Sequence, residues 1–333
     1  MSEIKNVLVT VQASTDNMKK LKEVLAPAKV TICTPSDREI IAQTAQTADV
    51  CILKSDLDDD ILAGKNIKCI HCCHAGVEKS ARPELFERGI ILTTSSGRSA
   101  SALAEHSLMF MLALTYDIPM LLRAQKRHVW VASPQYAQKT GLYGKTVGIL
   151  GVGKTGLEVA RLCKGFNMRV LGWRRGTDVP ENVDEIFSSD RGDNLHLLLK
   201  QVDYLVLCIE LNDNTWHMIS EEELSAMKPT AYLINMGRGR LIDEKALIAA
   251  LQKRVIAGAG LDTVEQEPLP PNSPLWDLPN VIITPHTTPQ LPDREDRMMS
   301  YVFKNIQAYR ENKDFVNRVT ERSILTKGRG KPQ

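Results

Sequence analysis

The chain has 333 residues, 43% of them hydrophobic, and a formal net charge of +2. This length favours two domains with sizeable cores, and the near-neutral charge gives no general argument for a nucleic-acid partner. The seven cysteines lack the spacing of a small disulfide scaffold, so we expect a reducing, cytoplasmic location.

Neither the N-terminus nor the most apolar stretch predicts a secretory or membrane segment. The sequence MSEIKNVLVTV lacks the long apolar region that follows basic residues in a signal peptide. Ala100–Leu114 is too short to span a bilayer and contains Glu105 and His106. A helix that is apolar nearly all round is normally buried. We therefore expect this helix to be buried, to cross between the domains, and to be the best candidate for contact with a partner subunit.

From the N-terminus, short apolar runs alternate with helical patterns. The predicted strands are Asn6–Val11, Lys29–Cys33, Val50–Leu53 and Ile67–Cys72. The predicted helices are Asn17–Leu25, Arg38–Thr47 and one that opens within Asp56–Ile61. This alternation predicts a parallel sheet and hence an α/β domain.

A cysteine- and histidine-rich run and a proline-containing segment in the N-terminal part of the chain each have more than one interpretation. The run Cys69-Ile70-His71-Cys72-Cys73-His74 has the composition of a zinc site, but no second CxxC or HxxxH lies nearby, so we favour a strand that ends at a ligand cleft and predict no metal. In Tyr116–Gln138, Pro119 and Pro134 limit helix. The basic residues of that segment are predicted to form a solvated or interface face: Arg123, Lys126, Arg127 and His128.

The stretch from Gly144 to Arg175 organises the second half. A buried strand is predicted at Thr146–Leu150, a helix at Leu157–Lys164 and a strand at Arg169–Gly172. A GxGxxG loop between strand and helix predicts a dinucleotide site, because its glycines permit a tight turn and a close approach of pyrophosphate to the helix N-terminus. The alternative is a coincidental glycine turn. The predicted cofactor contacts of this loop are Gly151, Gly153, Lys154, Thr155 and Gly156.

The end of the next strand predicts which dinucleotide is bound. NAD-binding units place a carboxylate about 20 positions after the loop, whereas an arginine there suits the 2′-phosphate of NADP. Here Trp173, Arg174 and Arg175 occupy that place, and no carboxylate follows until Asp178. We predict that Arg174 and Arg175 bind the phosphate and that Trp173 stacks on the adenine, so NADP is preferred and NAD remains possible. The alternative is a solvated basic turn.

After Arg175 the alternation of helices and strands resumes. The predicted helices are Leu195–Gln201, Ser220–Met227 with a capping box from Ser220 and Glu223, Glu244–Lys253, and Arg294–Asn312. The predicted strands are Tyr204–Ile209, Ala231–Asn235, Ile256–Leu261 and Val281–Thr284. The sequence thus predicts two doubly wound α/β domains.

Polar side chains follow the last of these strands, where doubly wound sheets bind their ligands. Arg238 follows one strand, Asp262 with Glu267 follows another, and His286 follows the third. An arginine that holds a carboxylate and a histidine oriented by a glutamate form a sensible set for reducing a 2-keto acid. Each residue taken alone also has an ordinary structural interpretation.

These segments together resemble the D-isomer-specific 2-hydroxyacid dehydrogenase family over nearly the whole length. The matching pieces are Ala75-Gly76-Val77, Ala104-Glu105-His106, GILGVGKTG at 148–156, NMGRGRLID at 235–243, AGLDTVEQEPLP at 259–270 and NVIITPH at 280–286. The resemblance implies that Arg238, Glu267 and His286 are catalytic. It further implies that Met236 and Asp262 lie at the cofactor, and that Ala75, Gly76 and Val77 receive the substrate carboxylate.

The resemblance also implies the domain arrangement and a homodimer. Residues 1–101 and 291–333 are expected to form a flavodoxin-like substrate domain, and residues 102–290 a Rossmann NADP-binding domain. Phosphoglycerate dehydrogenases of the family carry an arginine where Cys72 stands, which disfavours a phosphorylated substrate. Arg174 is more similar to NADP-using glyoxylate and hydroxypyruvate reductases, and Glu267 argues against formate dehydrogenases, which use glutamine there.

The leading hypothesis is an NADPH-dependent reductase of a small 2-keto acid such as glyoxylate or hydroxypyruvate, with His286 as proton donor. We expect neither a nucleic-acid nor a membrane partner. One alternative is an NAD-preferring dehydrogenase with another substrate. Another is a nucleotide-sensing binding protein like the corepressors that resemble this family and keep the same three residues. The sequence leaves open which keto acid is used and in which direction the reaction runs.

Overall fold

The computed structural model describes residues 3–131, 139–288 and 291–327. The chain forms two compact units. Unit 1 contains Met1–Ser99 together with Gln290–Gln333, and unit 2 contains Ala100–Pro289. These limits lie within two residues of the predicted division at 101/102 and 290/291.

Unit 1 is built on a five-stranded parallel sheet of order β2-β1-β3-β4-β5. Its strands are β1 (Asn6–Val9), β2 (Lys29–Ile32), β3 (Val50–Leu53), β4 (Cys69–Cys72) and β5 (Ile91–Thr94). Its helices are α1 (Thr15–Leu25), α2 (Arg38–Ala45), α3 (Asp59–Leu62), α4 (Pro83–Glu87) and α12 (Arg294–Glu311), with a 3₁₀ turn at Glu321–Ser323. The predicted parallel α/β sheet is confirmed, while β5 and α4 were not predicted.

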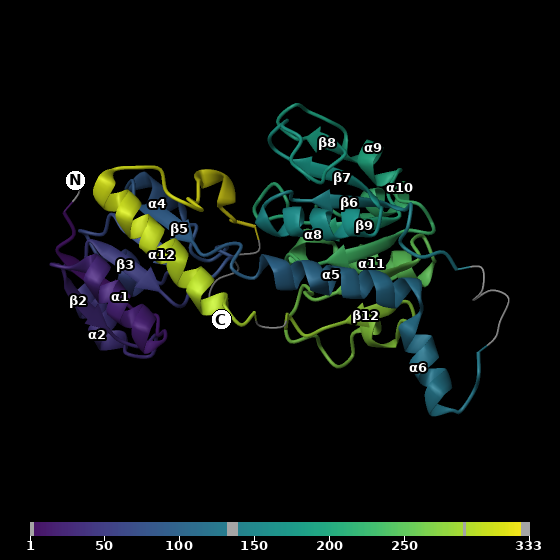
Figure 1. Cartoon of the computed structure of the whole chain (residues 1–333), viewed down its shortest axis with the longest axis horizontal. Helices are drawn as coiled ribbons and strands as arrows, with labels where there is room; N and C mark the ends of the chain where they lie inside the picture. The colour runs from purple at the N-terminus through teal and green to yellow at the C-terminus, as the bar shows by residue number, and fades with distance from the viewer. Residues whose placement is uncertain (1–2, 132–138, 289–290, 328–333) are drawn as a thin grey trace. The chain divides into compact units, whose positions relative to one another are not determined.

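Both ends of the chain contribute to unit 1. Helix α12 runs along α1 on one face of the sheet, so that the last long helix covers the first strands (Figure 1). Met299, Val302 and Ile306 of α12 pack in one buried cluster with Val7 and Val9 of β1. Burial of these side chains is what joins the C-terminal segment to the N-terminal domain.

Unit 2 is built on a seven-stranded sheet of order β12-β11-β10-β9-β6-β7-β8. Its strands are β6 (Thr146–Leu150), β7 (Arg169–Arg174), β8 (Glu185–Ser188), β9 (Tyr204–Leu207), β10 (Tyr232–Asn235), β11 (Gly258–Leu261) and β12 (Val281–Ile283). Its helices are α5 (Ala100–Thr115), α6 (Ile118–Lys126), α8 (Lys154–Gly165), α9 (Leu195–Leu199), α10 (Glu221–Ala226) and α11 (Glu244–Gln252). Short 3₁₀ turns occupy Gly239–Leu241 and Pro274–Asp277.

All the strand pairs of unit 2 are parallel, and the order reverses next to β6, as in a doubly wound Rossmann sheet. The predicted second α/β domain is therefore confirmed. Strand β7 extends to Arg174, two residues beyond the predicted end, and pairs with β8, which was not predicted. The predicted capping box of Ser220 and Glu223 is confirmed at the start of α10.

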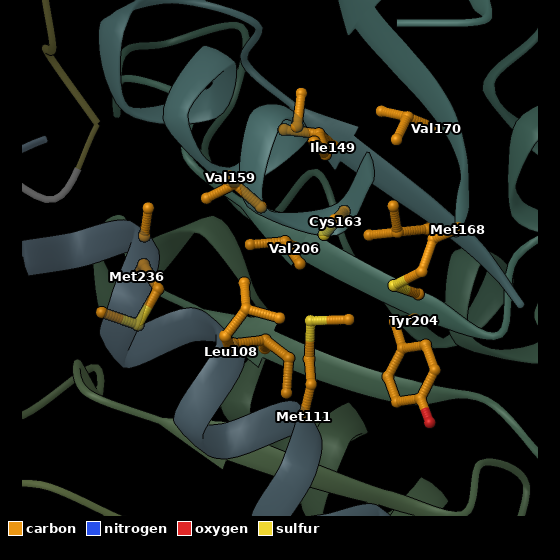
Figure 2. Close-up of a cluster of buried hydrophobic side chains, with 14 of the residues drawn as sticks. Leu108, Met111, Ile149, Val159, Cys163, Met168, Val170, Tyr204, Val206 and Met236 are labelled. Atoms are coloured by element: carbon orange, nitrogen blue, oxygen red, sulfur yellow. The ribbon is translucent and has the colours of Figure 1, made fainter. Parts of the chain in front are cut away.

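Helix α5 is largely buried within unit 2, as its apolar sequence predicts. Leu108 and Met111 of α5 meet Val159 and Cys163 of α8 and side chains of the sheet in one hydrophobic cluster (Figure 2). This packing explains why a helix with almost no polar face is stable here. Within the described part of the chain, no single helix is long and apolar enough to cross a membrane. Only α5 and α6 taken together meet that length and composition, across a bend of 62°.

Pro119 lies in the first turn of α6, so it limits where that helix begins but does not prevent a helix at Ile118–Lys126. A proline in the first turn removes no hydrogen bond that the helix needs, since that N–H has no partner within the helix. No residue of α6 is buried, and the helix extends away from the sheet of unit 2 (Figure 1). Pro134 lies outside the described residues.

Candidate active site

The glycine loop between β6 and α8 gives each glycine a separate role. Gly151 has a φ of +95°, and a Cβ there would lie 2.6 Å from the Ile209 backbone nitrogen. A Cβ on Gly156 would lie 2.2 Å from the Gly151 carbonyl oxygen, so only glycine lets the helix approach the loop. A Cβ on Gly153 would meet no atom within 4 Å. The space above Gly153 is therefore open, as close approach of a ligand to the backbone requires.

The N-terminus of α8 is suited to an anion. Its N-cap is Gly153, which has no side chain to cap the helix, and the first turn contains no acidic residue. Lys154 and Thr155 are the first two residues of the helix. The N–H groups of the first turn, the helix dipole and the open space at Gly153 together fit the pyrophosphate of a dinucleotide. All five predicted residues of the loop thus lie together at one helix end.

Trp173 and Arg174 are the last residues of β7, the strand next to β6. The Arg174 Nη1 donates to Asp178 Oδ2 at 3.0 Å, and the Asp178 side chain is 72% exposed. The Arg175 carbonyl oxygen accepts a hydrogen bond from the Ser188 hydroxyl, which anchors the turn to β8. Asp178 therefore lies in contact with the predicted phosphate-binding arginine, a pairing that the sequence analysis missed although the i, i+4 spacing was visible.

His286 and Glu267 form a hydrogen-bonded pair beyond β11 and β12. His286 Nδ1 and Glu267 Oε2 are 2.8 Å apart, and both side chains are partly exposed. The other oxygen of Glu267, Oε1, accepts from the Val264 N–H at 3.2 Å. The carboxylate thus holds the imidazole by Nδ1, with Nε2 on the opposite edge of the ring, which is the arrangement of a histidine that exchanges a proton with a substrate.

The backbone conformation and a backbone hydrogen bond also hold His286 in place. His286 has a φ of +50°, a left-handed conformation that costs about 1 kcal/mol for a non-glycine residue. Its N–H donates to the Asp262 carbonyl oxygen at 2.9 Å, which ties this loop to the end of β11. Strained backbone of this kind is concentrated at functional sites.

Arg238 lies in a tight turn after β10, the strand next to β11. Asn235 organises that turn: its Oδ1 accepts from the Gly237 N–H at 3.0 Å, and its Nδ2 donates to the Arg238 carbonyl oxygen at 3.0 Å. The Arg238 Nη1 donates to the Gly237 carbonyl oxygen at 2.9 Å. Met236, in the same segment, has its side chain buried in the core of unit 2.

Asp262 is 3% exposed and holds a small network at the end of β11. Its Oδ1 accepts from the Thr284 hydroxyl at 2.6 Å and from the Thr287 N–H at 3.2 Å, so it braces the segment on both sides of His286. The Thr284 hydroxyl also lies 3.1 Å from Nε2 of His106 on α5. Burial lowers the pKa of His106, partly opposed by the nearby Asp262 charge. The roles of Thr284 and His106 were missed, although His106 stands out as a polar residue in an apolar helix.

In unit 1, Ala75, Gly76 and Val77 form the segment after β4. The Gly76 carbonyl oxygen accepts from His74 Nδ1 at 2.7 Å, and the Val77 side chain is buried. Burial raises the pKa of the Cys69, Cys72 and Cys73 thiols to about 12 in each case. Within residues 3–131, 139–288 and 291–327, no group of three or more His, Cys, Asp or Glu side chains is arranged to hold a metal ion.

Residues 108–288 match the family model described as D-isomer specific 2-hydroxyacid dehydrogenase, NAD binding domain. The chain is 31% identical over 304 residues to a glyoxylate reductase of Korarchaeum cryptofilum, covering 89% of this chain and 90% of that protein. It is 34% identical to a D-3-phosphoglycerate dehydrogenase of Methanocaldococcus jannaschii, covering 84% of this chain but only 52% of that protein.

Solved structures show the same fold. A D-isomer specific 2-hydroxyacid dehydrogenase from Xanthobacter autotrophicus, in complex with NADPH and MES, superposes with a TM-score of 0.80 at 26% identity, covering 96% of this chain and 99% of that one. An NADPH-dependent glyoxylate/hydroxypyruvate reductase from Sinorhizobium meliloti, in complex with NADP and malonate, gives a TM-score of 0.74 at 23% identity, covering 98% of this chain and all of that one. The second likeness bears on the fold alone.

Proposed function

Because the chain belongs to the D-isomer-specific 2-hydroxyacid dehydrogenase family of oxidoreductases, we propose that it reduces a small 2-keto acid to the D-2-hydroxy acid with NADPH. The observation that carries this proposal is the Glu267–His286 pair, with 2.8 Å between Oε2 and Nδ1, at the carboxyl edge of a Rossmann sheet. When bound, the nicotinamide cofactor supplies the hydride. The carboxyl edge is where such sheets bind their ligands.

The proposed roles divide among residues at neighbouring strand ends. Arg238 would bind the substrate carboxylate through paired N–H groups, and its turn is already held by Asn235. His286 would donate its Nε2 proton to the carbonyl oxygen of the substrate as negative charge develops there. Glu267 would keep the imidazole in the orientation that this transfer needs. Asp262 would support the loop that presents His286 to the nicotinamide end of the cofactor.

The preference for NADP over NAD is part of the proposal. Arg174 ends β7 and Arg175 follows it, at the place where NAD-binding units carry a carboxylate, and a guanidinium matches phosphate geometry. Trp173 beside them would stack on the adenine. Asp178 works against this preference, because its carboxylate competes with a phosphate for Arg174.

Glyoxylate or hydroxypyruvate is the proposed type of substrate. The relatives named glyoxylate reductase support this choice, and Cys72 at the end of β4 offers no charge to a phosphorylated substrate. The backbone of Ala75, Gly76 and Val77 in unit 1 is proposed to receive the substrate carboxylate. A small substrate of this kind needs few contacts beyond its carboxylate and carbonyl groups.

A homodimer is also proposed, with α6 in its interface. Helix α6 has no buried residue, and its exposed apolar side chains continue into the following segment. The exposed large apolar residues around it are Met109, Tyr116, Ile118, Leu122, Val129 and Trp130, the last 92% exposed. The number of exposed apolar side chains in and around one helix supports an interface between subunits there.

The proposed location is the cytoplasm. All seven cysteines are free thiols, and six of them are buried. Buried thiols without partners are ordinary in proteins that fold in a reducing compartment, whereas extracellular domains pair their cysteines.

The test is steady-state turnover of the purified chain on a panel of 2-keto acids with NADPH, comparing the wild type with His286→Ala. Loss of the proton donor should lower kcat by about 10²- to 10⁴-fold while the Kd for NADPH stays unchanged. Unchanged turnover in the variant would remove His286 from the mechanism. Tight NADPH binding without turnover on any keto acid would instead favour a nucleotide-sensing protein.

A further inference from the structure

Two loops of the proposed active site fit against each other with no space for a side chain. They are residues 236–243, which follow β10 and carry Arg238, and residues 262–268, which follow β11 and carry Glu267. A Cβ on Gly239 would lie 2.0 Å from the carbonyl carbon and oxygen of Val264. The Val264 N–H is the group that donates to Glu267 Oε1. Val264, whose N–H orients Glu267, is therefore in close contact with the Arg238 turn through its carbonyl group.

Glu265, the next residue, fastens this contact to the start of α11. Its Oε1 accepts from the Glu244 N–H at 3.1 Å, and Oε2 of Glu244 accepts from the Glu265 N–H at 2.9 Å. Each glutamate side chain thus accepts a hydrogen bond from the backbone N–H of the other glutamate. Burial, together with the charge of Glu265, raises the pKa of Glu244.

His217 lies beside Glu265. Its Nε2 lies 2.8 Å from Glu265 Oε1, although the ring N–H does not point straight at the oxygen. The His217 backbone N–H donates to the Arg240 carbonyl oxygen at 2.8 Å, and its φ is +51°. Trp216 stacks on the His217 ring with 5.1 Å between centroids, and the Arg240 guanidinium lies 5.1 Å from the Trp216 ring. His217 therefore contacts one loop by its side chain and the other by its main chain.

We propose that Glu265, together with Glu244 and His217, positions the Val264 N–H under Glu267 and through it sets the direction of the His286 imidazole. This inference rests on the proposed function, in which His286 transfers a proton. Glu267 lies on a surface loop and its side chain is 37% exposed, so packing alone does not hold it. Misplacing a reacting group by about 1 Å can reduce the rate about 100-fold. Glu265 acts through Glu267 and does not touch the substrate.

A double-mutant cycle tests this positioning role. Glu265→Ala should lower kcat about tenfold to a hundredfold, with little change in KM for the keto acid or in Kd for NADPH. In a Glu267→Ala background the same change should have almost no further effect on kcat, because Glu265 acts on His286 only through Glu267. Glu265→Gln keeps an oxygen acceptor for the Glu244 N–H and should recover most of the lost rate. A matched control is His196→Gln, which removes the imidazole of another histidine–glutamate pair in unit 2, 3.4 Å from Glu223, and should leave kcat unchanged.

Hydrogen exchange of the free enzyme separates this inference from the proposed function. In Glu265→Ala, backbone amides of residues 262–268 should exchange faster than in the wild type, while those of β6 should not change. Unchanged exchange, an unchanged kcat, or an equal loss of rate with and without Glu267 would each overturn the positioning role. If the wild type reduces no keto acid but the exchange effect is present, the positioning of Glu267 stands and the proposed function fails.

Discussion

The sharpest prediction concerns the arginine at the end of β7. Arg174→Ala should weaken NADPH binding while NADH binding stays nearly the same, because only NADPH carries the 2′-phosphate. Hydrogen bonds to charged groups contribute about 1.5–3 kcal/mol, or roughly 10- to 150-fold in Kd. The Arg174 side chain is 29% exposed and already contacts Asp178 at 3.0 Å, so we expect the lower end, about 10- to 30-fold.

Asp178→Asn provides the opposite perturbation at the same place. It removes a carboxylate that competes for the Arg174 guanidinium and repels the phosphate. An exposed ion pair of this kind is worth about 0.2–1 kcal/mol, so NADPH should bind up to about fivefold tighter and NADH should change little. If the two variants changed the Kd for NADPH in opposite directions and left the Kd for NADH unchanged, Arg174 would be identified as the phosphate-binding side chain.

The assay is quenching of tryptophan fluorescence by NADPH and NADH, repeated at two salt concentrations because exposed charges are screened. Arg161→Ala is the matched control, since it removes another arginine of unit 2, one paired with Glu158 on α8. If Arg174→Ala weakened NADPH and NADH equally, or neither, the two arginines would be only a solvated turn. The NADP preference would then lose its support.

Three further predictions concern stability, the glycine loop and assembly. Burial lowers the pKa of His71 to about 3, so the folded state binds fewer protons than the unfolded chain below pH 6.5. Stability should therefore be complete above pH 6.5 and decline toward pH 3 by at most about 1.4 kcal/mol per pH unit, and His71→Gln should flatten that slope in urea unfolding. Gly156→Ala places a Cβ 2.2 Å from the Gly151 oxygen, so it should lower the free energy of unfolding by about 1–3 kcal/mol. It should also weaken the binding of both NADPH and NADH in thermal-shift titrations. Unchanged binding would contradict the close approach of α8 to the glycine loop. Leu122→Glu puts a charge on the α6 surface and should shift the sedimentation coefficient from dimer to monomer, whereas a wild-type monomer would refute the proposed interface.

Much of the fold follows from local pattern. Alternating apolar runs and helical periods predicted both parallel sheets, because strands buried on two faces are nearly uniformly apolar. The glycine loop was predictable for the same reason: tight turns and close helix approach allow no side chain at Gly151 and Gly156. Short elements were missed where the local signal is weak, as at β5 and β8, which gain their stability from pairing with neighbours already in place.

Which chemical groups stand at the strand ends could be read from local sequence, since parallel strands bring their carboxyl ends to one edge of the sheet. Local sequence did not determine which of these groups touch. Tertiary structure decided that Glu267 holds His286 and that His106 reaches Thr284, 178 positions away in the sequence. Tertiary structure likewise decided that Glu265 is fastened to Glu244 at the start of α11, 21 positions earlier in the sequence. The physical reason is that side-chain direction and loop packing depend on contacts distant in the chain, whereas residue type and strand period are local.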